Sequence, residues 1–154
     1  MLAKCNHMPY RPFEDQNCSI ARALAVVGER WTLLVLREVL LGRRRFREIR
    51  RNTGIATNIL TDRLQTLVDH GVLERRRYGE DAYEYVATDK ARDVTPVLVA
   101  LQQWGDRYEA PDGPPRVLVH GACNHETDPA LHCSHCERPI ASRELRVRPG
   151  PGAR

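Results

Sequence analysis

The sequence predicts a mainly α-helical fold that carries one small β-hairpin. Apolar residues recur at spacings of three and four through most of residues 18–71, which is the period of α-helices that each bury one face. The period then changes to two over residues 72–78 and 82–88. A short turn separates these runs, in which Gly79 and Asp81 can supply the unusual backbone angles of a hairpin. Two short helices followed at once by a hairpin form a winged helix-turn-helix.

Four helices are predicted before the hairpin. Residues 18–28 carry one apolar face, and residues 30–41 are apolar nearly all round, as is typical of a helix buried inside a domain. Residues 43–54 and 57–71 are short amphipathic helices joined by a glycine-containing turn, the helix-turn-helix pair. The second helix of this pair has apolar residues along one side, namely Leu60, Leu64, Leu67 and Val68.

A further helix is predicted after the hairpin. Thr88 and Asp89 can cap its start, and Pro96 marks a kink or a restart. Its apolar stripe comprises Val94, Val97, Leu98, Leu101 and Trp104. This stripe is wide enough to receive a partner helix, but packing on the chain's own core is an equally good interpretation of the pattern alone.

The chain of 154 residues suits one main domain with an appendage. We expect an N-terminal arm over residues 1–17, a winged helix-turn-helix domain over 18–110, a small zinc-ribbon-like module over 111–148 and a disordered tail over 149–154. No apolar run is long enough to cross a membrane and no export signal is visible, so we expect a cytoplasmic protein without a membrane partner.

The positive charge is concentrated in one part of the chain. The whole chain has a formal charge of +4, whereas residues 37–77 contain eleven arginines and five acidic residues, a net charge of +6. A codon bias would spread arginine evenly, but phosphate binding requires it in one place. The arginines best placed for phosphate contacts are Arg44, Arg47, Arg51, Arg63, Arg75 and Arg77.

The predicted helix 57–71 has a polar face opposite its leucines, formed by Asn58, Thr61, Asp62 and Gln65. Asn and Gln pair with adenine, Thr contacts the thymine methyl group, and Asp accepts from cytosine or repels a wrongly docked phosphate. The alternative is that this face is only the solvated side of an amphipathic helix. The local excess of arginine favours double-stranded DNA as the partner.

Residues 18–108 resemble the HxlR-type winged helix-turn-helix transcriptional regulators. The resemblance rests on the stretches CSIARALAVVGERWTLLVLREVLLG (18–42), RRFREIRR (44–51), GIATNILTDRLQTLVDHGVLERR (54–76) and YEYVATDKARDVTPVLVALQQWG (83–105). It implies a homodimer, with protomers joined through the first and last helices, on a pseudo-palindromic operator, and it favours repression. Ala56 departs from the family, which usually has serine at this helix cap, so Thr57 becomes the candidate cap.

Cys18 opens the first predicted helix. Helix N-termini lower the pKa of a thiol, and Arg22 one turn along adds to this effect. Cys18 also matches a cysteine that some members of the resembled family use to sense oxidants or electrophiles. Two interpretations stay open, a redox sensor with Cys5 as a candidate partner, and a small buried apolar residue.

Three of the five cysteines lie near the C-terminus among histidines. The segments HGACNH (120–125) and CSHC (133–136) supply one nitrogen and three sulfurs, with turns after the second ligand of each pair, at Asn124 and Glu137. The predicted ligands of a structural zinc ion are His120, Cys123, Cys133 and Cys136, and His125 or His135 can replace His120. The alternative is three thiols without a metal.

Enzymatic function is disfavoured. The sequence has no HExxH motif, no Gly-rich phosphate loop and no Ser-His-Asp arrangement, and four protein ligands leave no open position on a zinc ion. A metal- or redox-responsive module that binds a protein or a small ligand is the alternative to a DNA-binding regulator. The sequence points to no particular inducer.

Overall fold

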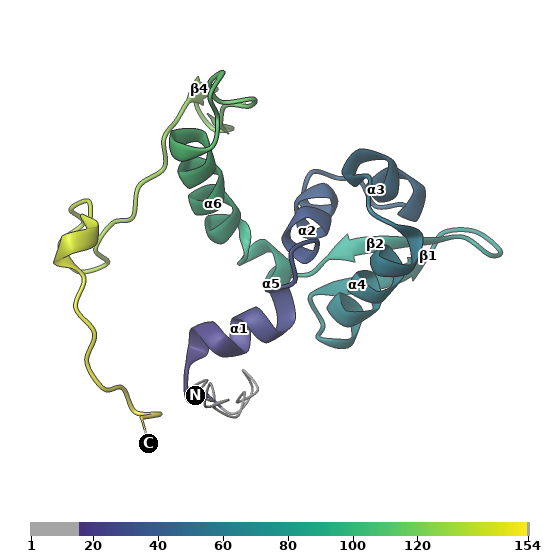
Figure 1. The fold of residues 1–154 in the computed structure, drawn as a ribbon, viewed down its shortest axis with the longest axis horizontal. Coiled ribbons are helices and arrows are strands. Elements are labelled where there is room, and N and C mark those ends of the chain that lie inside the picture. Colours follow the sequence, from purple (N-terminus) through teal and green to yellow (C-terminus); the bar gives the residue numbers. More distant parts are fainter. Residues whose placement is uncertain (1–15, 154) are drawn as a thin grey trace, which may run out of the picture. The chain divides into compact units, whose positions relative to one another are not determined.

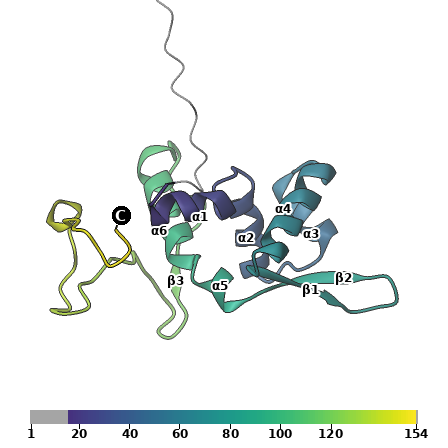
Figure 2. The same ribbon diagram turned by 90° about the horizontal axis from the view of Figure 1, so that it is seen from below.

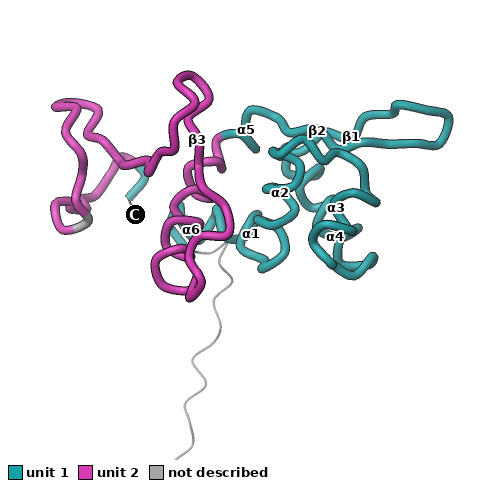
Figure 3. The backbone as a smooth tube through the Cα atoms, turned by 90° about the horizontal axis from the view of Figure 1, so that it is seen from above, with its two compact units in different colours: residues 1–92, 152–154 teal, residues 93–151 magenta. Residues whose placement is uncertain are grey.

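In the computed structural model, residues 16–153 are described, and the chain divides into two compact units (Figure 3). Unit 1 comprises residues 1–92 and 152–154, and unit 2 comprises residues 93–151. The division by packing therefore falls after Arg92, earlier than the expected end of the first domain at residue 110. Most of the predicted arm, including Cys5, lies outside the described residues.

Unit 1 begins with the four expected helices, shown in Figure 1: α1 (Ser19–Val27), α2 (Thr32–Leu40), α3 (Phe46–Thr53) and α4 (Thr57–Asp69). Helix α2 starts two residues later than predicted, because residues 28–31 form a turn. As predicted, α2 is central: it contacts both α3 and α4, and Val35 and Leu36 are completely buried.

The leucine stripe of α4 packs into the core of unit 1. Leu60, Leu64 and Leu67 are completely buried, together with Ile49 of α3. Burying an aliphatic side chain contributes roughly 1.5–3 kcal/mol. This packing fixes which side of α4 faces inward, and thus which side remains exposed.

The turn between α3 and α4 depends on one glycine. Gly54 ends α3 with φ +70°, a left-handed conformation that a residue with a Cβ adopts only at a cost. Ile55 then buries its side chain and Ala56 occupies the cap position of α4. Thr57 is the first helical residue and makes no side-chain cap, so the expectation that Thr57 caps this helix is wrong.

The hairpin pairs β1 (Leu73–Arg77) with β2 (Tyr83–Ala87) in antiparallel register, from Leu73 opposite Ala87 to Arg77 opposite Tyr83 (Figure 2). The Tyr78 N–H donates to the Ala82 carbonyl (3.0 Å), so the turn consists of residues 79–81, as predicted. Neither Gly79 nor Asp81 has a positive φ, so the expectation of unusual angles there is wrong.

The helix after the hairpin divides in two, as Pro96 predicts. Helix α5 (Asp89–Arg92) is capped by the Thr88 hydroxyl, which accepts from the Ala91 N–H (3.4 Å). Helix α6 (Thr95–Tyr108) then begins with Pro96 in its first turn. Two short strands, β3 (Val119–His120) and β4 (His125–Glu126), pair further along unit 2, and a 3-10 turn, η2, spans Ser142–Glu144. Within the described residues, no helix has the length and apolar content needed to cross a membrane.

Candidate nucleic-acid interface

Helix α4 exposes the polar face that the sequence predicts. The side chains of Asn58, Thr61, Asp62 and Gln65 all belong to exposed residues, opposite the buried leucines. Thr61 donates to the Thr57 carbonyl (2.9 Å), and Gln65 donates to the Asp69 carboxylate (2.7 Å). Among the described residues, no side-chain hydrogen bond engages Asn58. Asn58 therefore presents its whole amide in the first turn of the helix.

Three arginines of α3 gather beside the start of α4. Arg47, Arg50 and Arg51 line a shallow hollow that is closed on its other side by residues 54–55 and Thr57. All three arginines are exposed. The first-turn N–H groups of a helix whose cap residue, Ala56, has no polar side chain add a partial positive charge at the same place. The hollow therefore suits a phosphate group. Arg50 was not among the predicted phosphate contacts, because it directly follows Ile49 and so lies close to the apolar side of α3.

The segment before α3 is tied to the hairpin, which the sequence did not predict. The Tyr85 N–H donates to the Arg44 carbonyl (2.8 Å), and Arg45 forms an isolated bridge with Glu84. The Arg45 guanidinium lies over the Tyr78 ring, 4.8 Å from its centroid. The exposed Arg44 is thus held between the helix-turn-helix and the wing.

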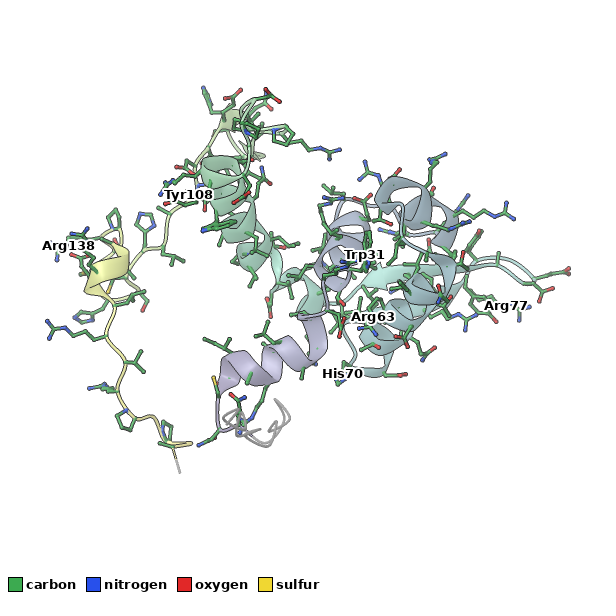
Figure 4. The ribbon with its side chains drawn as sticks, viewed as in Figure 1. Trp31, Arg63, His70, Arg77, Tyr108 and Arg138 are labelled. Carbon is green, nitrogen blue, oxygen red and sulfur yellow. The ribbon has the colours of Figure 1, made fainter. Side chains whose placement is uncertain are left out.

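The wing arginines make local contacts that orient them. Arg75 stacks over the Tyr83 ring at 3.8 Å, and the Arg77 side chain donates to the Gly79 carbonyl (2.9 Å) (Figure 4). Arg76 instead pairs with Glu74 at 3.1 Å. The two-residue period of the strand puts Arg75 and Arg77 on one face and Arg76 on the other. Both predicted wing contacts therefore point the same way.

Arg63 is placed differently from the other predicted phosphate contacts. Its side chain is only 19% exposed, it pairs with Asp62, and it lies 3.9 Å from Glu29. It borders the same hollow as Trp31, at the start of α2 (Figure 4). Two acidic partners already neutralise Arg63, so it is the least suited of the six predicted arginines to meet a phosphate.

A buried carboxylate joins α2 to α3. Glu38 is 3% exposed, and its side chain accepts from the Arg37 guanidinium (2.8 and 3.0 Å) and from the Asn52 amide (3.0 Å). Arg43 lies 3.4 Å away. Burial raises the pKa of Glu38, but the Asn52 and Arg37 hydrogen bonds and the two positive charges outweigh it, so the pKa lies below its ordinary value. The sequence alone does not indicate this role, because a glutamate among arginines resembles a solvated residue.

Cys18 lies at the N-cap position of α1, as predicted, and is half-buried. The Arg22 guanidinium, expected to act on this thiol, donates to the Asn17 side chain (3.1 Å). Apolar side chains of the same helix face solvent: Ile20 is 70% exposed and Leu24 is 43% exposed, and only Ala21 is buried.

None of the fourteen residues of α6 is buried. Of the five residues of the predicted dimer stripe, Val97, Leu101 and Trp104 are exposed by about half, and Val94 and Leu98 are half-buried. Tyr108 continues the exposed side, with its ring 5.5 Å from that of Trp104. On the opposite side, Gln102 donates to the Arg116 carbonyl (3.1 Å), and Gln103 to the Pro129 carbonyl (2.8 Å).

The predicted metal ligands lie in two pairs. His120 Nδ1 is 3.3 Å from Cys123 Sγ. In the second pair, the N–H groups of Cys136 and His135 hydrogen-bond to Cys133, and with the Cys136 side chain they lower the pKa of the Cys133 thiol. Among the described residues, no three such groups lie close enough together to hold a metal ion.

Comparison with known proteins identifies a family model and relatives that match this chain. A family model described as HxlR-like helix-turn-helix matches residues 26–112, more than half of the chain. An uncharacterized HTH-type transcriptional regulator of Mycobacterium tuberculosis is 46% identical over 137 residues, 87% of either chain. An alignment of that length extends past residue 112, so this relative shares part of the C-terminal segment.

Solved structures agree with this assignment. PA1607, described as a candidate transcription factor, has a TM-score of 0.78 at 35% identity, over 88% of this chain and 96% of its own. The reduced form of the transcriptional regulator YodB from B. subtilis has a TM-score of 0.52 at 28% identity, over 61% of this chain and 96% of its own. YodB is also known in a quinone-bound form, with a TM-score of 0.52 at 27% identity.

The fold, the exposed face of α4 and the relatives all indicate a transcriptional regulator rather than an enzyme. This chain belongs to the HxlR-like helix-turn-helix family.

Proposed function

We propose that this protein binds a specific double-stranded DNA sequence as a homodimer and represses transcription there. The observation that carries the proposal is the position of the exposed polar face of α4 beside the arginine-lined hollow of α3. Helix α4 enters the major groove, where residues of its first turns reach base edges. Asn58, Thr61 and Gln65 read bases, with adenine the preferred partner of the two amides.

Phosphates on either side of the groove are bound by separate groups of arginines. Arg47 and Arg51 of the hollow, with Arg44 before it, contact the backbone near the start of α4. Arg75 and Arg77, on one face of the wing, contact it further along. These contacts set the register of the protein on DNA and carry no sequence information themselves.

The second protomer covers the apolar side of α6. A helix with Val97, Leu101 and Trp104 exposed by about half has an unburied apolar stripe, and its opposite side is already occupied by polar contacts within unit 2. An isologous interface places the same stripe of both chains in contact. The two reading helices then meet half-sites about one helical turn apart. Repression needs only that the dimer occupy a promoter and exclude other proteins from it.

Selection of bound DNA from a random pool, followed by affinity measurements on the selected site, tests the DNA-binding proposal. The triple variant R44E/R47E/R51E should lose at least about 100-fold in affinity, because three phosphate contacts become repulsive. The matched control R143E/R146E/R148E changes the same charge at exposed residues after the second cysteine pair and should keep its affinity. Sequence-specific affinity that survives the first change would contradict the proposal and favour an interaction module. Transcription from a promoter that contains the site should fall on adding the protein.

Sedimentation equilibrium tests the dimer. Leu101→Asp and Trp104→Asp each place a charge in the proposed interface and should give monomers at micromolar concentration, where the unmodified protein is a dimer. Asp106→Lys changes charge on the opposite side of α6 and should leave the dimer intact. An unmodified chain that sediments as a monomer would rule out the proposed α6 interface.

We also propose that Cys18 makes DNA binding sensitive to electrophiles. Its support is the half-buried thiol at the start of α1, a helix with its own exposed apolar residues, and the quinone-bound form of YodB. A quinone or diamide should release the unmodified protein from DNA but not Cys18→Ser. Release of Cys18→Ser by the same reagents would assign sensing to another thiol.

A further inference from the structure

The C-terminal part of unit 2 contains the same backbone turn twice, at an offset of thirteen residues. We name residues 118–127 knuckle 1 and residues 131–140 knuckle 2. Three interactions of knuckle 1 recur at equivalent positions of knuckle 2. The Thr127 N–H donates to the Leu118 carbonyl (2.9 Å) as the Ile140 N–H does to the Leu131 carbonyl (2.8 Å), and the Asn124 N–H donates to the His120 carbonyl (2.8 Å) as the Glu137 N–H does to the Cys133 carbonyl (2.8 Å). The strand pair Val119–Glu126 likewise corresponds to the pair His132–Pro139. The repeat is a property of the backbone, because few of the side chains match.

Both knuckles contain a strained residue at the same position. Asn124 has φ +54° and Glu137 has φ +59°, and these are the only residues other than glycine with a positive φ in the described part of the chain. The left-handed region is unfavourable for any residue with a Cβ. Each strained residue directly follows a cysteine, Cys123 or Cys136. Because the same unfavourable conformation follows both cysteines, we infer that these turns serve to position the two sulfur atoms.

Each turn brings two metal-binding side chains to one side. In knuckle 1, His120 Nδ1 lies 3.3 Å from Cys123 Sγ. In knuckle 2, Cys133 and Cys136 occupy the positions equivalent to His120 and Cys123, so both turns place one candidate ligand near the start of the loop and one directly before the left-handed residue.

Apolar burial does not explain why these turns form. Between residues 118 and 140 only Leu118, Cys133 and Ile140 are even half-buried, and every other residue is exposed. Segments this short, without a core, hold a defined structure only with a metal or a covalent link. Two repeated turns that each present a ligand pair match a metal-stabilised module.

We propose that His120, Cys123, Cys133 and Cys136 together bind one zinc ion, with one knuckle on each side of it. The described structure holds the two pairs on separate knuckles, so residues 128–130, which join the knuckles, must bend to bring them together. One imidazole and three thiolates form a closed tetrahedral set, which suits zinc in a structural role. The site is independent of the proposed DNA contacts, which all lie in unit 1.

Among the three candidate histidines, the geometry favours His120. It occupies the position in knuckle 1 that Cys133 occupies in knuckle 2, and its ring already lies beside the sulfur of Cys123. His125 instead directs Nδ1 at the Cys123 carbonyl (2.7 Å). His135 lies inside the loop of knuckle 2, at the position that Ala122 occupies in knuckle 1, where the first turn has no candidate ligand.

Metal content of the full chain tests the proposal. By inductively coupled plasma mass spectrometry, the protein purified under reducing conditions should contain about one zinc per chain. Cys123→Ser and Cys136→Ser, one from each knuckle, should each lower the bound zinc at least about tenfold. Cys18→Ser, His125→Ala and His135→Ala are controls that should keep it. Less than about half an equivalent in the unmodified chain would overturn the proposal.

A measurement without substitutions covers the case in which a cysteine variant fails to fold. Chains reconstituted with Co²⁺ should show the visible absorption of a tetrahedral ion and the near-ultraviolet charge-transfer bands expected of three thiolates. Bands that correspond to two thiolates, or zinc retained after substitution in one knuckle, would show that the two knuckles do not share a metal and would refute the site. Loss of metal in His125→Ala with retention in His120→Ala would refute the assignment of His120.

Discussion

Substituting Glu38 tests whether the position of the helix-turn-helix depends on one buried carboxylate. Glu38 of α2 accepts a hydrogen bond from Asn52 of α3, so it joins the helix at the centre of unit 1 to the helix that carries the arginine-lined hollow. Glu38→Gln keeps the shape of the side chain but removes its charge. Hydrogen bonds to a charged group contribute about 1.5–3 kcal/mol, against about 0.5–1.5 kcal/mol for neutral pairs.

The structure sets the size of the expected loss. Arg37 and Arg43, the two cations near Glu38, have side chains 45% and 36% exposed, so solvent screens their part of the interaction. The Asn52 bond is part-buried and is weakened less by solvent. We therefore expect Glu38→Gln to lower the free energy of unfolding by about 1–2 kcal/mol, and Glu38→Ala by about 2–4 kcal/mol, because Asn52 then loses its partner.

The effect should depend on pH in one direction. The pKa of Glu38 is lower in the folded chain than its ordinary value, so the native state binds the proton less readily than the unfolded chain does. The stabilisation is therefore fully present above the ordinary glutamate pKa of about 4.3 and is lost as the pH falls through the lower folded pKa. The difference between the unmodified protein and Glu38→Gln should shrink over that range.

Urea denaturation, followed by tryptophan fluorescence at pH 7 and at pH 4 and below, measures both effects. Protein concentration must be equal throughout, because self-association changes apparent stability. Glu74→Gln is the control: Glu74 is exposed and pairs with the exposed Arg76, so its substitution should change stability by less than about 0.5 kcal/mol. A loss at Glu38→Gln that is no larger than the control, or that stays constant with pH, would refute this account of the carboxylate.

Further predictions concern α4, the turn before it and the arginine-lined hollow of α3. Leu64→Ala removes a completely buried side chain and should lower stability by about 2–5 kcal/mol in thermal or urea unfolding, far more than the same change at half-buried Val68. Gly54→Ala should cost about 1 kcal/mol from its φ of +70° alone, since nothing lies within 4 Å of the added Cβ; a loss above about 3 kcal/mol would indicate a clash instead. Asn58→Ala should relax base preference at one operator position by about 1–3 kcal/mol, whereas Arg47→Ala should weaken all sites equally and reduce the salt slope by about 0.9.

Much of unit 1 could be predicted from the sequence, because its elements depend on local patterns. The spacing of leucines in α4 defines both the helix and its buried side, and the change of period after Gly71 defines the hairpin. The exposed polar face of α4 follows directly, since it is the side that the leucines do not occupy. These inferences need no knowledge of which segments meet in space.

Predictions failed where the structure depends on contacts between distant segments or on exact turn geometry. The pairing of Arg44 and Arg45 with β2 joins residues about forty positions apart, and no local pattern signals it. Gly79 lies in a turn that closes between Tyr78 and Ala82, so the chain has room to turn without a positive φ. In the sequence Glu38 resembles a solvated residue, because its hydrogen-bond partner Asn52 lies fourteen positions further along the chain.

For α6, the sequence predicted the apolar side of the helix but not the contacts of its polar side. The sequence shows an apolar stripe that fits either the chain's own core or a partner. In the structure, the other side of α6 makes hydrogen bonds within unit 2. Gln102 and Gln103 donate to the segments that precede and follow knuckle 1. The polar side of α6 is therefore used within unit 2, whereas Val97, Leu101 and Trp104 on its apolar side remain exposed by about half.

Because the residues concerned belong to different units, the proposals for DNA binding, dimerisation and metal binding can be tested separately. The DNA-contacting residues and their core belong to unit 1, whereas the knuckles and the exposed stripe of α6 belong to unit 2. Loss of the metal should leave the core of unit 1 folded, because none of its buried residues lies after Ala91. It should act on DNA affinity only through the segments that Gln102 and Gln103 hold against α6, and hence through dimerisation. A chain without metal that is still dimeric should therefore bind DNA normally, and a monomeric chain should bind single half-sites with an unchanged base preference.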